Sequence, residues 1–321
     1  MTIIMRAMAL FAACLVSGAA FGQQYPTKPV KIIIPFPAGG VTDLGGRLIA
    51  QKLSEKLGQQ FYIENVGGAG GNLGMAQVAR APGDGYTILL SSSSVTVNPS
   101  LYTKMPFDVE KDLIPVTKAG GSPNSWLVHP SFPAKDMKEL VEMMRKEPGK
   151  YSVGSPGAGT TPSLSIEQLK HDLKVNFVTV PFAGGGPMTQ SLLGNHVPIV
   201  CGAIGNSVEL IKDGKIRALG ITDKKRLETL PNIPTLDELG IKGQEAETIA
   251  GVFVPAGTPK EIVDKLQQQI AAVVKSPDIR ARLLELGIVP EGDSPASFAA
   301  YVKADIAKWK RVIEQANVPK I

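Results

Sequence analysis

Short apolar segments alternate with longer segments of helical periodicity along most of this chain, and this alternation most restricts its possible folds. In the N-terminal part, apolar strands are expected at Val30–Ile34, Phe61–Ile63 and Tyr86–Leu90, with helices between them at Asp43–Leu57 and Gly71–Arg80. The order strand–helix–strand–helix–strand is typical of a parallel sheet with right-handed crossovers. The alternation therefore predicts an α/β protein.

The same alternation begins again further along the chain. Because 321 residues exceed the size at which a single core stops growing, a second set of strands and helices favours two α/β domains over one. The expected elements are strand Trp126–His129, helix Met137–Arg145, strand Ser152–Val153, helix Ser163–His171, strand Asn176–Val180, helix Pro187–Leu193, and strands Ile199–Ala203 and Ala218–Ile221.

The C-terminal part is predicted to be helical. Helices are expected at Pro259–Lys275, Pro277–Leu286 and Pro295–Gln315, each with proline at its first position. Helices that follow the last strand have no sheet of their own, so they are expected to return to the first domain. Between the two sets, Met105–Asn124 is rich in Gly, Pro and Lys and has a broken pattern. The predicted organisation is domain 1 at residues 23–123 and 249–321, and domain 2 at residues 124–248.

The first 22 residues have the features of a cleaved export signal. Arg6 is their one charged residue, Ala9–Ala20 is apolar, and small residues Ala20 and Gly22 occupy positions −3 and −1 before Gln23. The apolar run is shorter than the ~20 residues that a membrane anchor needs. Cys14 lacks a good lipobox before it, which argues against a lipoprotein.

Cleavage before Gln23 would leave Cys201 as the single cysteine. An exported protein with one thiol must keep it away from oxidants. Cys201 ends the apolar run Val197–Cys201, so we expect a buried thiol and not a nucleophile.

Composition and motifs exclude several function classes. The formal net charge of +5 is small and the charges are interspersed, so nucleic acid is not expected as a partner. The three histidines are scattered without metal-ligand spacing, and Ser155 lacks the first glycine of GxSxG and is followed by Pro156. Gly68–Gly74 has the spacing GxGxxxG, one residue longer than the GxGxxG fingerprint of dinucleotide-binding loops, and no acidic residue ends a following strand to bind the ribose. We therefore expect no metal, no cofactor and no catalytic constellation.

Loops rich in glycine, or in one case serine, follow six of the expected strands. In an open α/β sheet, ligands bind at the ends of the strands, where glycine lets the backbone approach closely and helix N-termini favour anions. Two facing sets of such loops predict an anion-binding cleft between the domains. The loops are Pro35–Asp43, Glu64–Gly74, Ser91–Ser94, Gly154–Thr161, Pro181–Gly186 and Gly202–Asn206.

These loops carry the motifs of a known family. The motifs, in chain order, are Tyr25–Val30, Pro35–Gly40 with Asp43 and Arg47, Glu64-Asn65 with Gly68–Asn72, Pro82–Thr87, Val180-Pro181-Phe182 with Gly184, Leu192–Gly194, Gly214–Leu219 and Pro255–Pro259. In this combination the chain resembles the Bug family, the periplasmic substrate-binding receptors of tripartite tricarboxylate transporters. The resemblance covers essentially the whole chain after residue 22.

The resemblance implies an α/β, two-domain, periplasmic-binding-protein-like fold of type II with the ligand cleft between the domains. It also implies a monomeric periplasmic receptor that captures a small organic acid or amino acid and delivers it to integral-membrane transporter subunits. The carboxylate would be held by backbone amides and ordered water in the loop Pro37–Asp43. An exported enzyme acting on a carboxylated substrate in the same cleft is the alternative.

The loops and the resemblance together nominate a set of ligand-binding residues. In the loops expected near the ligand, the chain departs from the commonest family residues at Val66-Gly67, Ser163, Phe182-Ala183 and Gln190-Ser191. The candidates are Phe36, Ala38, Gly39, Gly40, Thr42, Asp43, Gly70, Asn72, Ser92, Ser93, Ser155, Gly159, Thr160, Thr161, Ser163, Phe182, Ala183, Gly184 and Ala203.

Overall fold

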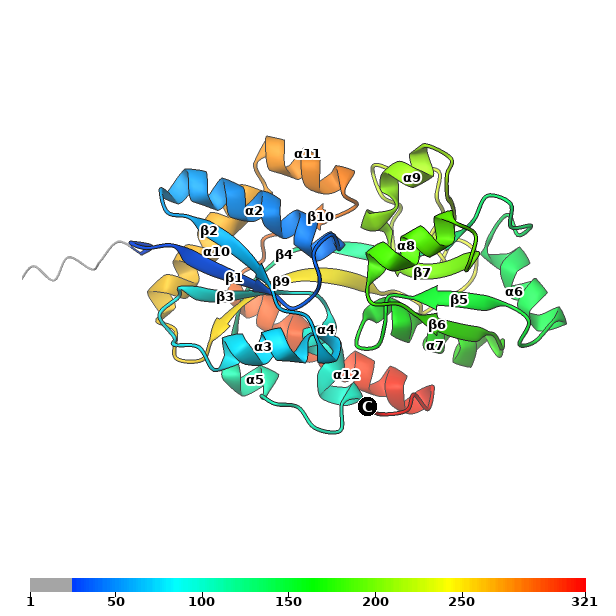
Figure 1. Cartoon of the computed structure of the whole chain (residues 1–321), viewed down its shortest axis with the longest axis horizontal. Helices are drawn as coiled ribbons and strands as arrows, with labels where there is room; N and C mark the ends of the chain where they lie inside the picture. The colour runs from blue at the N-terminus through cyan, green and yellow to red at the C-terminus, as the bar shows by residue number, and fades with distance from the viewer. Residues whose placement is uncertain (1–24) are drawn as a thin grey trace, which may run out of the picture.

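The computed structural model describes residues 25–321, and two lobes lie side by side along its long axis (Figure 1). The predicted signal peptide of residues 1–22, its cleavage before Gln23 and the lipoprotein alternative at Cys14 lie outside the described residues.

The first lobe contains the predicted strand–helix–strand–helix–strand unit. Its first strand β1 (Val30–Ile34) lies between β2 (Phe61–Asn65) and β3 (Thr87–Ser91), and both pairings are parallel. Helices α2 (Val41–Leu57) and α3 (Asn72–Ala79) make the connections. Because consecutive parallel strands are joined through helices, the loops after β1, β2 and β3 all lie at one edge of the sheet.

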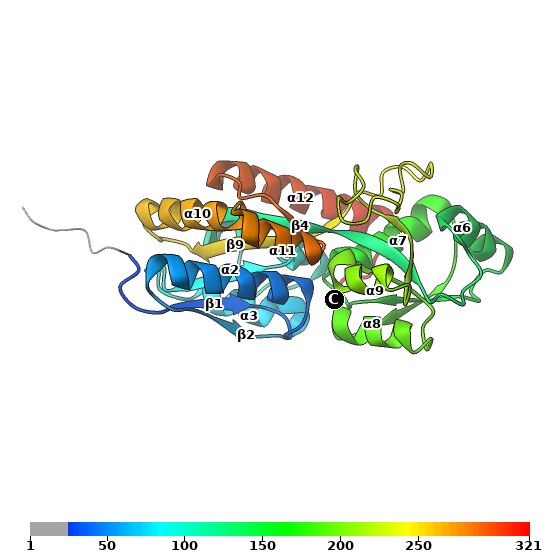
Figure 2. The ribbon, with the colours of Figure 1, turned by 90° about the horizontal axis from the view of Figure 1, so that it is seen from above.

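The predicted break between the two units is a strand. Instead of an irregular Met105–Asn124, the structure has β4 (Leu113–Val128), a 16-residue strand that runs from one lobe into the other (Figure 2). Its register shifts between Pro115 and Thr117 and again between Lys118 and Gly120. Pairing with neighbouring strands and these two irregularities accommodate the Pro and Gly residues that obscured the strand in the sequence.

A second strand was overlooked in the sequence. The strand β9 (Glu247–Pro255) lies between β3 and β4 and is antiparallel to both, so the sheet is mixed. The C-terminal helices therefore follow β9 and not the strand at Ala218–Ile221. The run from Ile249 to Val254 is buried, so it lacks the polar–apolar alternation that marks a half-exposed strand.

The second lobe repeats the arrangement of the first. Strand β5 (Ser152–Ser155) lies between β6 (Val178–Pro181) and β7 (Ile199–Ala203), both parallel to it, and β7 and β8 (Arg217–Ile221) pair antiparallel with β4. Its helices are α6 (Met137–Lys146), α7 (Thr161–Leu173), α8 (Gly185–Leu193) and α9 (Val208–Lys212), with the short turn η3 (Ile204–Asn206).

The C-terminal helices pack on the first lobe, as the sequence predicts. Helix α10 (Lys260–Val274) contacts α2 and β4, α11 (Pro277–Glu285) contacts α2, and α12 (Pro295–Gln315) contacts α4 (Ser94–Leu101) and also reaches α7 in the second lobe. No helix between residues 25 and 321 is long and apolar enough to span a bilayer. The remaining elements are η2 (Ala69–Gly71), α5 (Val109–Asp112) and β10 (Val289–Pro290).

The thiol of Cys201 is fully buried in β7, as the sequence predicts. Burial raises the pKa of this thiol well above its ordinary value, which keeps it protonated. We expect an aromatic disulfide reagent at pH 8 to modify Cys201 negligibly in the native protein and stoichiometrically after unfolding in guanidinium chloride. Rapid modification of the native protein would contradict this burial.

Candidate ligand-binding site

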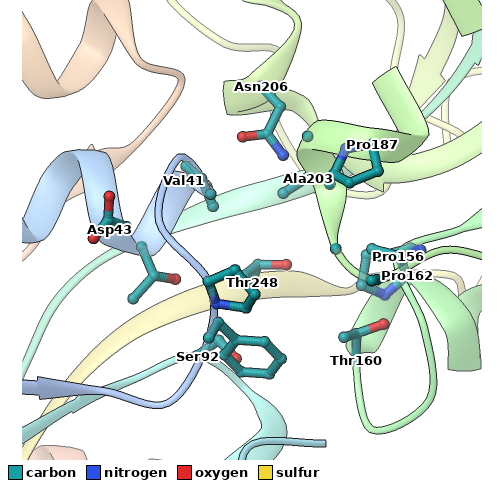
Figure 3. Close-up of a pocket in the computed structure, with 18 of the residues that line it drawn as sticks. Val41, Asp43, Ser92, Pro156, Thr160, Pro162, Pro187, Ala203, Asn206 and Thr248 are labelled. Atoms are coloured by element: carbon teal, nitrogen blue, oxygen red, sulfur yellow. The ribbon is translucent and has the colours of Figure 1, made fainter. Parts of the chain in front are cut away.

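A cavity of about 220 Å³ lies between the two lobes. Its volume is below the ~300–1,000 Å³ of pockets for drug-sized ligands, which indicates a small solute. Figure 3 shows residues of the first lobe on one side, the second lobe opposite, and Ser92 and Thr248 between them. The walls consist of Phe36, Pro37, Ala38, Gly40, Val41, Thr42, Asp43, Ser92, Ser93, Pro156, Thr160, Thr161, Pro162, Ala183, Gly184, Gly185, Gly186, Pro187, Ala203, Asn206 and Thr248.

The loop between β1 and α2 supplies the first-lobe wall. Gly39 adopts φ +89°, a left-handed conformation that favours glycine. Gly40 then precedes α2 in an extended conformation with φ −77°. The first residues of α2, Val41, Thr42 and Asp43, have no carbonyl four residues earlier within the helix to accept their N–H groups. These N–H groups and the helix dipole favour an anion at this end of the cavity.

The side chain of Asp43 braces this loop from behind. Its carboxylate accepts hydrogen bonds from the Gly39 N–H at 3.0 Å, from Nε and Nη2 of Arg47 at 3.0 Å each, and from Nδ2 of Asn65 at 2.9 Å. Nδ2 of Asn65 also donates to the Phe36 carbonyl at 3.0 Å. Burial alone would raise the pKa of Asp43, but the hydrogen bonds from Arg47, Gly39 and Asn65 hold it below 3.8. Asp43 therefore orders the backbone of the loop.

Replacing Asp43 by Asn should weaken ligand binding about tenfold and lower the free energy of unfolding by about 1–2 kcal/mol, because an amide cannot accept both Arg47 donors. Isothermal titration and denaturant unfolding measure the two effects. Asp278→Asn is the control, since Asp278 is an exposed carboxylate paired with Lys52. Binding by Asp43→Asn equal to wild type would contradict a bracing role.

The same variant gives an expected pH dependence. Because the folded-state pKa of Asp43 lies below its ordinary value, its stabilisation is fully present above about pH 4 and is lost as the pH falls through the folded-state pKa. The unfolding free energies of wild type and Asp43→Asn should therefore converge progressively as the pH is lowered from about 4. A constant difference over that range would contradict the lowered pKa.

Both lobes meet the strand β9 at the floor of the cavity. The Ser93 hydroxyl, which follows β3, donates to the Glu247 carbonyl at 2.9 Å and accepts the Ile249 N–H at 3.0 Å. The Thr161 hydroxyl, at the start of α7 in the second lobe, donates to the same carbonyl at 2.9 Å. Hydrogen bonds from both lobes thus converge on one residue of a strand that connects them.

Comparison with known proteins identifies the family of this molecule. A sequence profile described as "Tripartite tricarboxylate transporter family receptor" matches residues 46–318. The chain belongs to this receptor family. Protein BugT of Bordetella pertussis is 30% identical over 322 residues, which cover 99% of this chain and 98% of BugT.

Solved structures of related proteins share this fold. Periplasmic binding protein BugD superposes with a TM-score of 0.86 at 36% identity, covering 92% of this chain and all of that chain. An R. palustris protein solved with adipate has a TM-score of 0.88 at 34% identity, with 92% and 100% covered. MatC from Rhodopseudomonas palustris, solved with malate, has a TM-score of 0.83 at 33% identity, with 90% and 100% covered. The receptor therefore has the two-domain periplasmic-binding-protein fold.

Twelve of the residues nominated from the receptor's sequence line the cavity. They come from the loops after β1, β3, β5, β6 and β7 and were chosen because they follow strand ends. These residues are Phe36, Ala38, Gly40, Thr42, Asp43, Ser92, Ser93, Thr160, Thr161, Ala183, Gly184 and Ala203.

Three nominated residues, Gly70, Asn72 and Gly159, lie outside the cavity wall, where the two lobes contact each other around Asn98. Nδ2 of Asn98 donates to the Gly70 carbonyl at 2.9 Å and to the side-chain oxygen of Asn72 at 2.8 Å. Gly159 of the second lobe packs against the same amide, because a Cβ there would approach Oδ1 of Asn98 to 2.5 Å.

The other four nominated residues also lie outside the cavity wall. Gly39 lines a neighbouring hollow beside α8 and α11. The Ser155 hydroxyl accepts the Gly157 N–H at 3.3 Å, and Phe182 packs near Gly154. Ser163 lies in the first turn of α7.

Nine lining residues were not nominated. Thr248 was missed because the strand β9 was missed, although its buried apolar run was a usable signal. The others lie within three residues of a nominated residue, in the same loops or at the start of the next helix, and which of them face the cavity depends on how each loop turns. The nine are Pro37, Val41, Pro156, Pro162, Gly185, Gly186, Pro187, Asn206 and Thr248.

The described lining residues can bind a solute by hydrogen bonds and by the fit of its shape, but they include few side chains that take part in catalysis. Among the described lining residues there is no Cys, His, Lys or Arg. Within residues 25–321, no three His, Cys, Asp or Glu side chains are grouped to hold a metal ion.

Proposed function

We propose that this receptor captures a small carboxylated solute, an organic acid or amino acid, in the cavity between its lobes and delivers it to a tripartite tricarboxylate-type membrane transporter. The observation that carries the proposal is the set of free N–H groups at the start of α2, which open into a small cavity closed by the second lobe. The adipate and malate bound by two related receptors are carboxylates of this kind.

The proposed mechanism is closure of the lobes around the solute. We assign domain 1 to residues 23–123 and 249–321 and domain 2 to residues 124–248. In support, β4 pairs with β9 up to Pro123 and with β7 from Asn124 onward. The two crossing strands would act as the hinge, and contacts between the domains, such as Gly159 against the side chain of Asn98, would favour the closed state.

The proposal extends to location and partners. Residues 1–22 would direct export and be removed before Gln23, so the receptor would act in the periplasm as a monomer. It would bind its solute stoichiometrically without turnover, and its partners would be integral-membrane subunits. The exported-enzyme alternative predicts chemical change of the bound acid in the same cavity.

A panel of carboxylates would test the proposed function. We expect at least one organic acid or amino acid to raise the melting temperature and to bind with one-to-one stoichiometry in isothermal titration. Small-angle scattering should show compaction when that acid is added, and NMR of the acid should show it unchanged after overnight incubation. Failure of every carboxylate to bind would overturn the proposal, and conversion of the acid would support the enzyme alternative.

Intact mass of the exported protein tests cleavage before Gln23.

A further inference from the structure

The charges on the cavity wall limit which chemical groups a bound solute can carry at its far end, away from the carboxylate placed at the start of α2. Asp43 is the single charged residue among the described lining residues, and its carboxylate is already engaged by Arg47, Gly39 and Asn65. The cavity wall therefore presents no free charge of either sign. An anionic group can be held there only by backbone or neutral side-chain donors.

The two walls of the cavity differ in their backbone donors. On the first-lobe wall, residues 40–43 all retain their N–H groups, and Pro37 is the one proline among the described residues of this wall. On the second-lobe wall, Pro162 lies in the first turn of α7, and Pro187 lies in the first turn of α8, where each removes one N–H from a helix N-terminus. Pro156 adds a third ring to this wall, and Figure 3 shows the three prolines on the second-lobe side, opposite Val41 and Asp43.

The rest of the second-lobe wall is small and uncharged. It contains Gly184–Gly186, one amide, and the hydroxyls of Thr160 and Thr161, which already donate to the carbonyls of Gly157 and Glu247. Ala183 and Ala203 also line it. The side chain of Asn206 lies against Gly185, since a Cβ there would come within 2.1 Å of Nδ2, and its Oδ1 is buried without a hydrogen-bond partner among the described residues. This amide can satisfy one neutral polar group of a solute.

We propose that the cavity selects monocarboxylates whose far end is uncharged, apolar or bearing one neutral hydrogen-bonding group that meets Asn206. The carboxylate lies at the start of α2, and the uncharged end lies against the prolines of α7 and α8. This selectivity rests on the proposed carboxylate-receptor function. A second carboxylate at the far end would find no cation among the described lining residues, and α7 and α8 each keep only two N–H groups in their first three residues, where α2 keeps three.

Matched pairs of acids test the proposal by isothermal titration at pH 7.5. The pairs are butanoate with succinate, hexanoate with adipate, and benzoate with terephthalate, and 1-hexanol tests the need for a carboxylate. In the pair that binds most tightly, we expect the monocarboxylate to bind at least about tenfold more tightly than its dicarboxylate partner, and 1-hexanol not to bind. Equal or tighter binding of the dicarboxylates would overturn the selectivity while leaving the carboxylate-receptor function intact. Failure of all carboxylates, including those of the wider panel, would overturn both.

Two variants test the residues assigned to the far wall. Ala183→Lys adds a cation there and should shift the adipate-to-hexanoate affinity ratio at least about tenfold towards adipate. We expect the wild type to bind 6-hydroxyhexanoate more tightly than hexanoate, because the hydroxyl can meet the amide of Asn206. Asn206→Leu removes this amide with little change in side-chain size, so the ratio of the two affinities should fall to near one. Unchanged ratios in folded variants, judged by melting temperature, would overturn the assignment of the far wall.

Discussion

Replacing Gly40 by Val is expected to abolish solute binding while leaving the fold intact. Gly40 lines the cavity, has φ −77°, which valine can adopt, and has nothing within 4 Å of the position of a Cβ. The added side chain would therefore occupy free space at the N-terminus of α2 instead of straining the backbone. We expect the affinity for the most stabilising acid of the panel to fall at least about 100-fold, or about 2.7 kcal/mol, in isothermal titration.

Two further substitutions separate space from backbone conformation. Gly40→Ala adds only a methyl group and should give a smaller loss of affinity than Gly40→Val. Gly39→Ala forces alanine into φ +89° and should lower the free energy of unfolding by about 1–2 kcal/mol. Normal binding by Gly40→Val would show that the carboxylate does not lie in this loop.

Replacing Lys118 by Met is expected to lower the free energy of unfolding by about 3 kcal/mol. The Lys118 side chain is 6% exposed, and its Nζ lies 2.5 Å from Oε1 of Glu247 and 2.8 Å from Oε1 of Glu291. Its ammonium also lies 4.6 Å from the centre of the Tyr301 ring. Burial alone would lower the pKa of Lys118, but Glu247 and Glu291 raise it, so the residue stays charged. Methionine would leave two largely buried carboxylates without a counter-ion.

Denaturant unfolding at pH 7 measures this effect. The triple variant Lys118→Met, Glu247→Gln, Glu291→Gln should recover much of the lost stability, because it removes the unpaired charges together with the ammonium. Lys52→Met is the matched control and should leave the midpoint almost unchanged, since Lys52 pairs with Asp278 at the surface. A small effect of Lys118→Met would mean that water reaches these carboxylates freely.

Local pattern was sufficient to predict most of the elements. The strands Val30–Ile34 and Ile199–Ala203 and the helix Pro295–Gln315 have the same bounds in the structure as in the sequence-based expectation. Each has a signal within its own residues, either a short apolar run or a proline start followed by helical periodicity. The burial of Cys201 followed from the same kind of signal.

The strands β4 and β9 show where local pattern fails. In β4, Pro115, Gly120 and Gly121 hide a strand that is held by pairing with residues more than a hundred positions away, such as Lys118 with Gly251. In β9, Ala250 and Gly251, which have low strand propensity, interrupt the buried apolar run from Ile249 to Val254. Both strands depend on distant partners, which short-range propensity does not record.

The sequence by itself determined the family motifs, the α/β alternation and the loops that carry the cavity, because glycine-rich turns after apolar strands are local features. Only the tertiary structure decided which residues of those loops face the cavity. It placed Ala203, Asn206 and Thr248 in the wall and moved Gly70 and Gly159 to a contact between the lobes. The physical reason is that the direction in which a loop residue points depends on how the two lobes, joined by β4 and β9, pack together. That packing arises from contacts between segments far apart in the chain.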